Sequence, residues 1–163
     1  MRSIVRAAPF ITLFIAAYFA LSLGLEAFRA LTSPLNGLEN RAIAGIVFGI
    51  DRIVGLSPVN LLRAAAALAA FKLMIAVILL VYLAERVRGP IGGSHYETLE
   101  AALLLVLAST TIAAMAAIIA GHADVARLCA LQVFLAMTAA IVTFVEQRDR
   151  RITDAALQII KSS

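Results

Sequence analysis

Long stretches of apolar residues alternate along the chain with short clusters that hold nearly all the charged residues. Roughly 20 apolar residues in a helix cross the hydrocarbon core of a bilayer, and four stretches reach about that length. We predict transmembrane helices over residues 7–25, 61–84, 99–121 and 126–146. The first stretch is longer than the core of a usual secretory signal, so we expect it to be a span. Little else fits in residues 1–163, which predicts a single transmembrane domain.

The connection between the first two spans is itself apolar over residues 36–55, although charged residues interrupt it. Its longest uncharged stretch, residues 42–50, is too short to cross a bilayer. Apolar residues recur at helical spacing, with Gly45 and Gly49 as close-packing positions. This pattern favours a helix that lies in the membrane interface or dips partway into it as a re-entrant helix. The alternative is a fifth span, which would bury charges at both ends.

Residues typical of helix ends flank the spans. Ser57 is a plausible N-cap, with Pro58 at the first helical position. Ser94 can begin a capping box with the glutamate three residues later. Gly121 suits the C-cap of the third span, and Asp124 can cap the fourth. These signals support the predicted spans.

The last segment, residues 147–163, mixes basic residues with apolar residues at helical spacing. This pattern predicts a short amphipathic C-terminal helix on the membrane surface. The predicted fold class is therefore all-α. It is a polytopic transmembrane bundle of four helices, with an interfacial or re-entrant helix after the first span and this C-terminal helix.

Composition and charge agree with a membrane protein. Hydrophobic residues make up 63% of the chain and charged residues 15%, whereas soluble domains are nearer half and a quarter. The net charge of +4 comes from basic residues that flank the apolar stretches, so they are expected to meet lipid headgroups rather than nucleic acid. More of them lie on the side of the two termini. This bias, and the lack of glycosylation acceptors, predicts a bacterial inner-membrane protein with both termini in the cytoplasm.

Small residues line one face of each of the last three spans, at spacings of three and four. Lipid provides no hydrophobic drive for helices to associate, so small residues and polar contacts hold them together. The stripes therefore predict contact faces, although alanine is common enough here for one to arise by chance. The predicted packing positions are Ala65, Ala69, Ala76, Ala113, Ala116, Ala136 and Ala139.

Lys72 lies near the middle of the second span. A lysine at the bilayer centre costs about 2.5–3.5 kcal/mol on insertion scales, so it usually faces protein or water and often marks a function. No acidic residue is expected at its depth, since Glu26 and Glu100 fall at the ends of spans. Counting from the same side of each span identifies polar residues at similar depth. The predicted intramembrane polar cluster is Lys72, Tyr18, Ser109, Thr110 and Gln132.

Three roles are open for Lys72. It can donate hydrogen bonds to Tyr18, Gln132 and backbone carbonyls, and so only fix the register of the helices. It can pair with an acidic residue of another subunit. It can also bind an anionic or carbonyl ligand, or relay protons.

The sequence contains no catalytic, metal-binding or cofactor motif. His95 and His122 fall at opposite ends of the third span, and Cys129, the single cysteine, has the character of a small core residue. We therefore expect no cofactor and no enzymatic activity. The expected partners are the lipid bilayer and either other membrane subunits or further copies of the chain, with no nucleic acid.

The small size and a buried lysine without an internal counter-charge favour an accessory or assembly subunit of a larger membrane complex. The alternative is an oligomeric small-solute or ion transporter or channel component that uses the polar cluster around Lys72. A second alternative, a lipid- or quinone-handling membrane enzyme, lacks the acid, base or metal that it would need.

Overall fold

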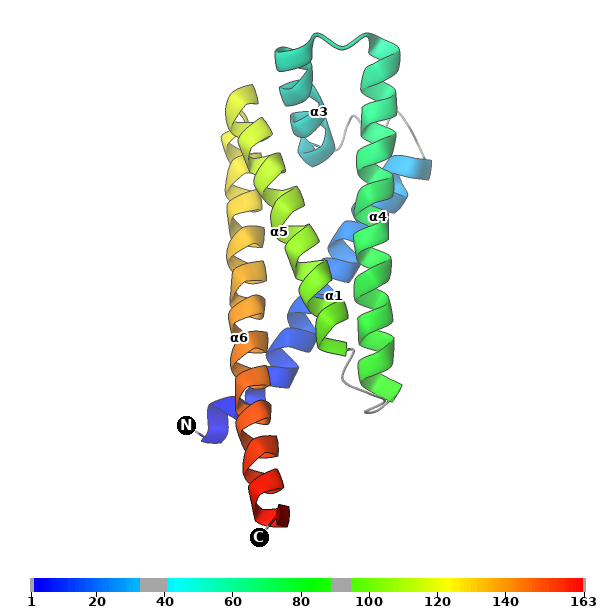
Figure 1. Ribbon diagram of the computed structural model, residues 1–163. Coiled ribbons are helices and arrows are strands. Elements are labelled where there is room, and N and C mark those ends of the chain that lie inside the picture. The colour runs from blue at the N-terminus through cyan, green and yellow to red at the C-terminus, as the bar shows by residue number, and fades with distance from the viewer. Residues whose placement is uncertain (1, 33–40, 89–94, 163) are drawn as a thin grey trace.

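The described part of the chain is almost entirely helical. The computed structural model describes the backbone of residues 2–32, 41–88 and 95–162, and the side chains of residues 10–32, 43–88 and 97–148. No strand occurs within these ranges. The helices, in chain order, are α1 (Arg2–Thr32), α3 (Arg41–Val54), α4 (Pro58–Arg88), α5 (His95–Ala120) and α6 (Ala123–Ser162). Both termini lie at one end of the bundle, and α3 lies at the other (Figure 1).

Four of the helices are long and apolar enough to cross a membrane. The segments that qualify are Phe10–Thr32, Pro58–Arg88, Glu97–Ala120 and Ala123–Arg148. Large apolar side chains cover their outer surfaces; Phe14 and Phe134, for example, are 70% and 67% exposed. Water would make such a surface unstable, whereas lipid is its natural surrounding. The prediction of an all-α fold with four apolar helices is confirmed, and the chain is an integral membrane protein.

The first helix runs seven residues further than the span predicted for it. The prediction ended at Leu25, before the charge of Glu26, but α1 continues to Thr32. The hydroxyl of Thr32 donates a hydrogen bond to the carbonyl of Phe28 at 2.9 Å. A charged residue marks a change in solvent preference and does not end a helix by itself, and this segment contains good helix formers. Glu26 is therefore a helical residue with a defined facing direction.

The small-residue stripes lie at the contacts between helices. α1 crosses the bundle diagonally and packs along α4, while α5 and α6 form an antiparallel pair (Figure 1). The largest core cluster contains residues of α1, α4, α5 and α6, including the fully buried Phe19 and Leu79. All of the alanines proposed as packing positions from the sequence are at most 7% exposed. They are Ala65, Ala69, Ala76, Ala113, Ala116, Ala136 and Ala139.

The helix α3 stands upright beside α4 and α5, with its axis along the bundle (Figure 1). Ile43 and Val47 are fully buried against its neighbours. A Cβ atom on Gly49 would lie 2.6 Å from the carbonyl oxygen of Ala116 on α5, a distance that real Cβ atoms do not show, whereas a Cβ on Gly45 would meet only ordinary contacts. The absence of a side chain at Gly49 therefore lets α3 pack closely against α5. The helix has 14 residues, too few for a fifth span.

The predicted extent of this segment is only partly covered by the structure. Residues 36–40 lie outside the described residues, and residues 41–54 are helical. The upright direction of α3 differs from that of a helix lying flat on a membrane surface. Whether it lies in the interface or dips into the hydrocarbon stays a prediction.

The ends of the helices follow the capping signals, with one exception. The amide of Leu61 donates to the carbonyl of Ser57 at 3.0 Å, so Ser57 is the N-cap of α4 and Pro58 its first residue. Gly121 has a φ of 79°, the left-handed conformation that suits glycine at a helix end. These two predictions are confirmed, and Ser94 lies outside the described residues.

The prediction that Asp124 is the N-cap of α6 is wrong. The helix begins at Ala123, and the amide of Ala126 donates to the carbonyl of His122 at 3.1 Å. His122 therefore holds the N-cap position of α6. Its amide also closes the preceding helix, α5, by donating to the carbonyl of Ala117 at 2.9 Å. Asp124 lies in the first turn, where a negative charge complements the helix dipole.

The C-terminal segment is part of α6. The predicted fourth span ended near residue 146, with a separate amphipathic helix after it. Instead, one continuous helix runs from Ala123 to Ser162, and it projects beyond the other helices (Figure 1). The side chains after residue 148 lie outside the description, so contact of this segment with a membrane surface stays a prediction.

Candidate functional site

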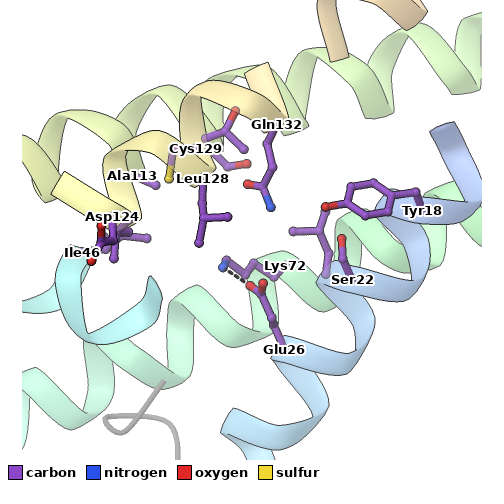
Figure 2. A pocket seen from close by; sticks show the side chains of 14 residues that line it. Tyr18, Ser22, Glu26, Ile46, Lys72, Ala113, Asp124, Leu128, Cys129 and Gln132 are labelled. Carbon is purple, nitrogen blue, oxygen red and sulfur yellow. Dashed lines mark hydrogen bonds and ion pairs between the residues drawn. The ribbon is translucent and has the colours of Figure 1, made fainter. Parts of the chain in front are cut away.

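A cavity of about 310 Å³ lies inside the bundle, at the half nearer to α3. This volume is at the lower end of the range for small-molecule sites. All five described helices contribute to its walls. Its polar lining residues are Tyr18, Ser22, Glu26, Lys72, Ser109, Thr110, Asp124 and Gln132. Figure 2 shows several of these side chains converging on one space.

An ion pair between Lys72 and Glu26 forms one wall of the cavity. The Nζ atom of Lys72 lies 2.6 Å from Oε2 of Glu26, and the two side chains are 12% and 28% exposed. The expectation that no acidic residue reaches the depth of Lys72 was therefore wrong. α1 is longer than predicted and crosses α4 at an angle, which brings a residue near the end of α1 to the middle of α4 (Figures 1 and 2).

A signal for Glu26 was present in the sequence. The buried face of α1 contains Leu23, Ala27 and Ala30, which are 2%, 0% and 9% exposed. Residues three or four apart share a helix face, so Glu26 follows Leu23 by three and precedes Ala30 by four. In a helix that continues past Leu25, this spacing places the carboxylate of Glu26 on the face that packs against the bundle.

Three hydroxyl groups of the cavity donate their protons to the backbone of their own helices. Thr110 Oγ1 donates to the carbonyl of Val106 at 2.7 Å, and Ser109 Oγ donates to the same carbonyl at 3.0 Å. Ser22 Oγ donates to the carbonyl of Phe19 at 3.4 Å. A hydroxyl has one proton and two lone pairs. These three oxygens are therefore left as hydrogen-bond acceptors at the cavity.

Gln132 and Tyr18 are cavity residues with no hydrogen-bond partner among the described side chains and backbone. The amide of Gln132 points into the space above Lys72 (Figure 2). The ring of Tyr18 packs edge-on against Phe19, with 5.5 Å between ring centroids, and 46% of its surface is exposed. The structure thus places all five members of the predicted polar cluster around one cavity, together with Glu26, Ser22 and Asp124, which are not part of the predicted cluster.

The cavity extends from the end of the bundle toward its middle. Asp124, in the first turn of α6, is exposed, whereas Cys129 is buried and lines the same space. Gln132 lies about 12 Å beyond Asp124 along the helix, at 1.5 Å per residue. A solute or water molecule that reaches Lys72 from Asp124 would therefore pass Cys129.

A second polar group ties the helices together at the opposite end of the bundle. Arg86 Nη2 on α4 lies 3.4 Å from Oε1 of Glu146 on α6. Gln147 Nε2 donates to Oε1 of Glu100 on α5 at 2.7 Å. None of these four residues lines the cavity. Their positions fit a role in holding α4, α5 and α6 together.

Comparisons of the chain with known protein families, with curated proteins and with solved structures gave no match. Within the described residues, no three histidine, cysteine, aspartate or glutamate side chains gather in a group that could hold a metal ion. The geometry of the cavity is therefore the basis for inferring what the protein does.

Proposed function

We propose that this integral membrane protein is a component of a transport pathway and binds a small solute in the cavity beside Lys72 and Glu26. It acts by binding and not by catalysis. The observation that supports this function best is a cavity of about 310 Å³ that reaches a charged pair inside an otherwise apolar bundle.

Several polar atoms at the cavity have hydrogen-bonding capacity that nothing in the described structure satisfies. Protein interiors pack as densely as organic crystals, with few voids larger than a water molecule. A polar group held away from water without a hydrogen bond costs free energy. The amide of Gln132 and the free lone pairs of Ser109 and Thr110 face a space large enough for a ligand. Water or a solute in that space would supply their hydrogen bonds.

An accessory or assembly subunit is the second candidate. Its strongest argument from the sequence was a lysine without an internal counter-charge, and the pair with Glu26 removes that argument. Exposed apolar side chains on α3 still favour it, because Phe48, Ile53 and Val54 are 44%, 68% and 63% exposed. Such side chains at the end of a bundle suit contact with another membrane subunit or a second copy of this chain as well as with lipid.

The proposed setting is the bacterial inner membrane, with both termini in the cytoplasm. Both termini lie at one end of the bundle (Figure 1), and the basic residues that flank the spans are more numerous at that end. The positive-inside rule then assigns this end to the cytoplasm. The cavity reaches the opposite end through Asp124, so the proposal has solute arriving from the periplasmic side.

Cys129 offers a direct test, because it is the chain's single cysteine and lines the cavity. The full-length protein in lipid vesicles would be treated with a small, water-soluble methanethiosulfonate, and its reaction followed by mass spectrometry. We expect Cys129 to react, because the proposal requires a path for water from Asp124. Ser109→Leu, which fills part of the cavity, should slow the reaction, whereas Ala108→Leu, on an exposed position next to it, should not.

A Cys129 that stays unmodified in the folded protein, but reacts after unfolding, would contradict the solute-binding function. Purification in mild detergent then separates the two candidates. Foreign membrane subunits in fixed proportion would support the accessory role. The chain alone, or a defined oligomer of it, with a reactive Cys129 would support the pathway role.

A further inference from the structure

We propose that the solute is a small organic cation, an ammonium group on a short apolar body, and that Lys72 occupies the position of that ammonium while the cavity is empty. This inference rests on the proposed function, since it names the ligand class of the same cavity. Its basis is the balance of hydrogen-bond acceptors and charges on the cavity walls.

Acceptors outnumber donors around the pair, even with the amide NH2 of Gln132 and the hydroxyl of Tyr18 counted as donors. The hydroxyl protons of Ser22, Ser109 and Thr110 are used inside their own helices, so these residues present oxygen lone pairs. Glu26 offers a second oxygen, Oε1, beyond the one that Lys72 contacts. An ammonium group has three donors and no acceptor. It therefore matches this set of oxygens better than a carboxylate, which brings only further acceptors.

The charges point the same way. The charged side chains of the cavity are Glu26 from α1, Lys72 from α4 and Asp124 from α6. Within the described lining, α3 and α5 contribute none, and Tyr18 and Cys129 are the other groups that can titrate. The lining thus carries two carboxylates, Glu26 beside Lys72 and the exposed Asp124 at the end of the bundle, and one ammonium. A monovalent cation would balance these charges, whereas an anion would add to the excess of negative charge.

Lys72 shows how such a ligand would be held. Its ammonium lies 2.6 Å from Glu26, the distance of a short charge-assisted hydrogen bond. The side chain enters the cavity from α4 beside Leu128 (Figure 2). An incoming ammonium would take this place at Glu26, and the displaced Lys72 would remain in a cavity that also contains Asp124. Competition with an internal ammonium keeps the affinity low enough for release, which a transport site requires.

The remaining walls define the rest of the ligand. Leu23, Ile46, Val125 and Leu128 give the cavity an apolar surface on the α1, α3 and α6 sides. A purely inorganic cation would leave this surface without a partner, whereas a short alkyl or aryl group would cover it. The ligand class is therefore a small amphipathic ammonium compound.

The test uses three matched probes with the full-length protein in nanodiscs: benzylammonium, benzoate and benzyl alcohol. They share one ring and differ in the charge of the attached group. Binding is measured by titration calorimetry, with the modification rate of Cys129 as an independent readout. We expect benzylammonium to bind and to slow the modification, while benzoate and benzyl alcohol at the same concentration do neither.

Variants of the pair give opposite signs for a cation site and an anion site. For a cation site, Glu26→Gln should weaken benzylammonium binding about tenfold or more, and Lys72→Gln should strengthen it about tenfold, because the competing ammonium is gone. Asp124→Asn, on an exposed position, should weaken binding about threefold. Glu97→Gln, an exposed acid that does not line the cavity, is the control and should leave the affinity unchanged.

The contrary outcomes are distinct. Benzoate binding that is lost in Lys72→Gln and strengthened in Glu26→Gln would overturn the proposal that the ligand is a cation. The proposed solute site would still stand. Equal binding of all three probes would overturn the cation too, since only the ring would be recognised. If none binds and Cys129 is inert, both this inference and the proposed function fail. Should Lys72→Gln not fold, Asp124→Asn against Glu97→Gln still decides.

Discussion

Two ion pairs within the described part of the bundle differ in what surrounds them. Lys72 and Glu26 approach to 2.6 Å at the wall of a cavity, with side chains 12% and 28% exposed. Arg86 and Glu146 are 3.4 Å apart, and the side chain of Glu146 is only 7% exposed. The shorter pair thus has space beside it and polar neighbours without partners. The longer pair contains the more deeply buried carboxylate and lies outside the cavity.

This difference separates a pair that can exchange partners from one that holds the fold. Breaking a buried pair leaves an uncompensated charge, and the cost depends on whether the remaining group can find water or another partner. A charge beside a cavity has that option, whereas a carboxylate packed among helices has little of it. The pair of Lys72 and Glu26, the cavity pair, is therefore suited to ligand exchange. The pair of Arg86 and Glu146, the end pair, is suited to stability.

The largest loss of stability is expected at the end pair. Glu146→Gln keeps the shape of the side chain but removes the buried carboxylate that Arg86 contacts. We expect the free energy of unfolding to fall by about 3 kcal/mol, measured by titration with sodium dodecyl sulfate in mixed micelles. The modification rate of Cys129 should be unchanged in the folded fraction. A change smaller than that of Glu26→Gln would remove the proposed contrast between the pairs.

The wall that α3 gives to the cavity can be tested at its two glycines. Gly49→Ala places a methyl group 2.6 Å from the carbonyl of Ala116, and such overpacking should cost about 2 kcal/mol of unfolding free energy. Because Ile46 on the same helix lines the cavity, Cys129 should also react faster. Gly45→Ala, whose Cβ would meet only ordinary contacts, is the matched control. Equal effects of both substitutions would show that α3 does not pack closely against α5 as described.

A smaller loss is expected at the cavity pair. Glu26→Gln should lower the free energy of unfolding by about 1.5 kcal/mol, the worth of a hydrogen bond to a charged group. The loss is limited because water in the cavity can solvate Lys72. Lys72→Gln combined with Glu26→Gln should recover part of it, since no charge remains unpaired. Additive losses in the double variant, measured in the same micelle titration, would argue that the two side chains do not interact.

The smallest effect is expected at the exposed hydrogen bond between Gln147 and Glu100, beside the end pair. Gln147→Ala removes the hydrogen bond to Glu100, which is exposed. Its loss should cost about 0.5 kcal/mol, because water replaces the amide as a donor. A loss close to that of Glu146→Gln would show that Arg86, Glu146, Gln147 and Glu100 stabilise the fold as one network. It would contradict a buried ion pair with a separate, exposed hydrogen bond beside it.

The sequence predicted the helices better than it predicted their contacts. Four apolar stretches and the signals at Ser57, Pro58 and Gly121 define helices through local physics, namely burial in lipid and backbone geometry at helix ends. The pattern of apolar residues does not predict the end of α1, because the charge of Glu26 ends the apolar stretch but does not end the helix. In fact the helix continues, and its crossing angle against α4, a property of tertiary packing, brings Glu26 to Lys72.

The site shows the same division. Depth along a span is a local count, and it selected Tyr18, Ser109, Thr110 and Gln132, which all line the cavity with Lys72. Glu26 and Asp124 come from other depths in their own helices. They reach the cavity because α1 is tilted and because the lining extends to the first turn of α6. Tilt and cavity shape depend on how the five described helices pack together, and no single stretch of sequence specifies them.

The contact between Lys72 and Glu26 can be measured directly by solid-state NMR in lipid bilayers. The chain's lysines are Lys72 and Lys161, so ¹⁵N labelling of lysine and ¹³C labelling of glutamate gives a simple spectrum. We predict a strong dipolar coupling between Lys72 Nζ and a glutamate Cδ, which disappears in Glu26→Gln and weakens when benzylammonium is added. A coupling that is absent from the native protein, or that persists in Glu26→Gln, would contradict the pair on which the site is built.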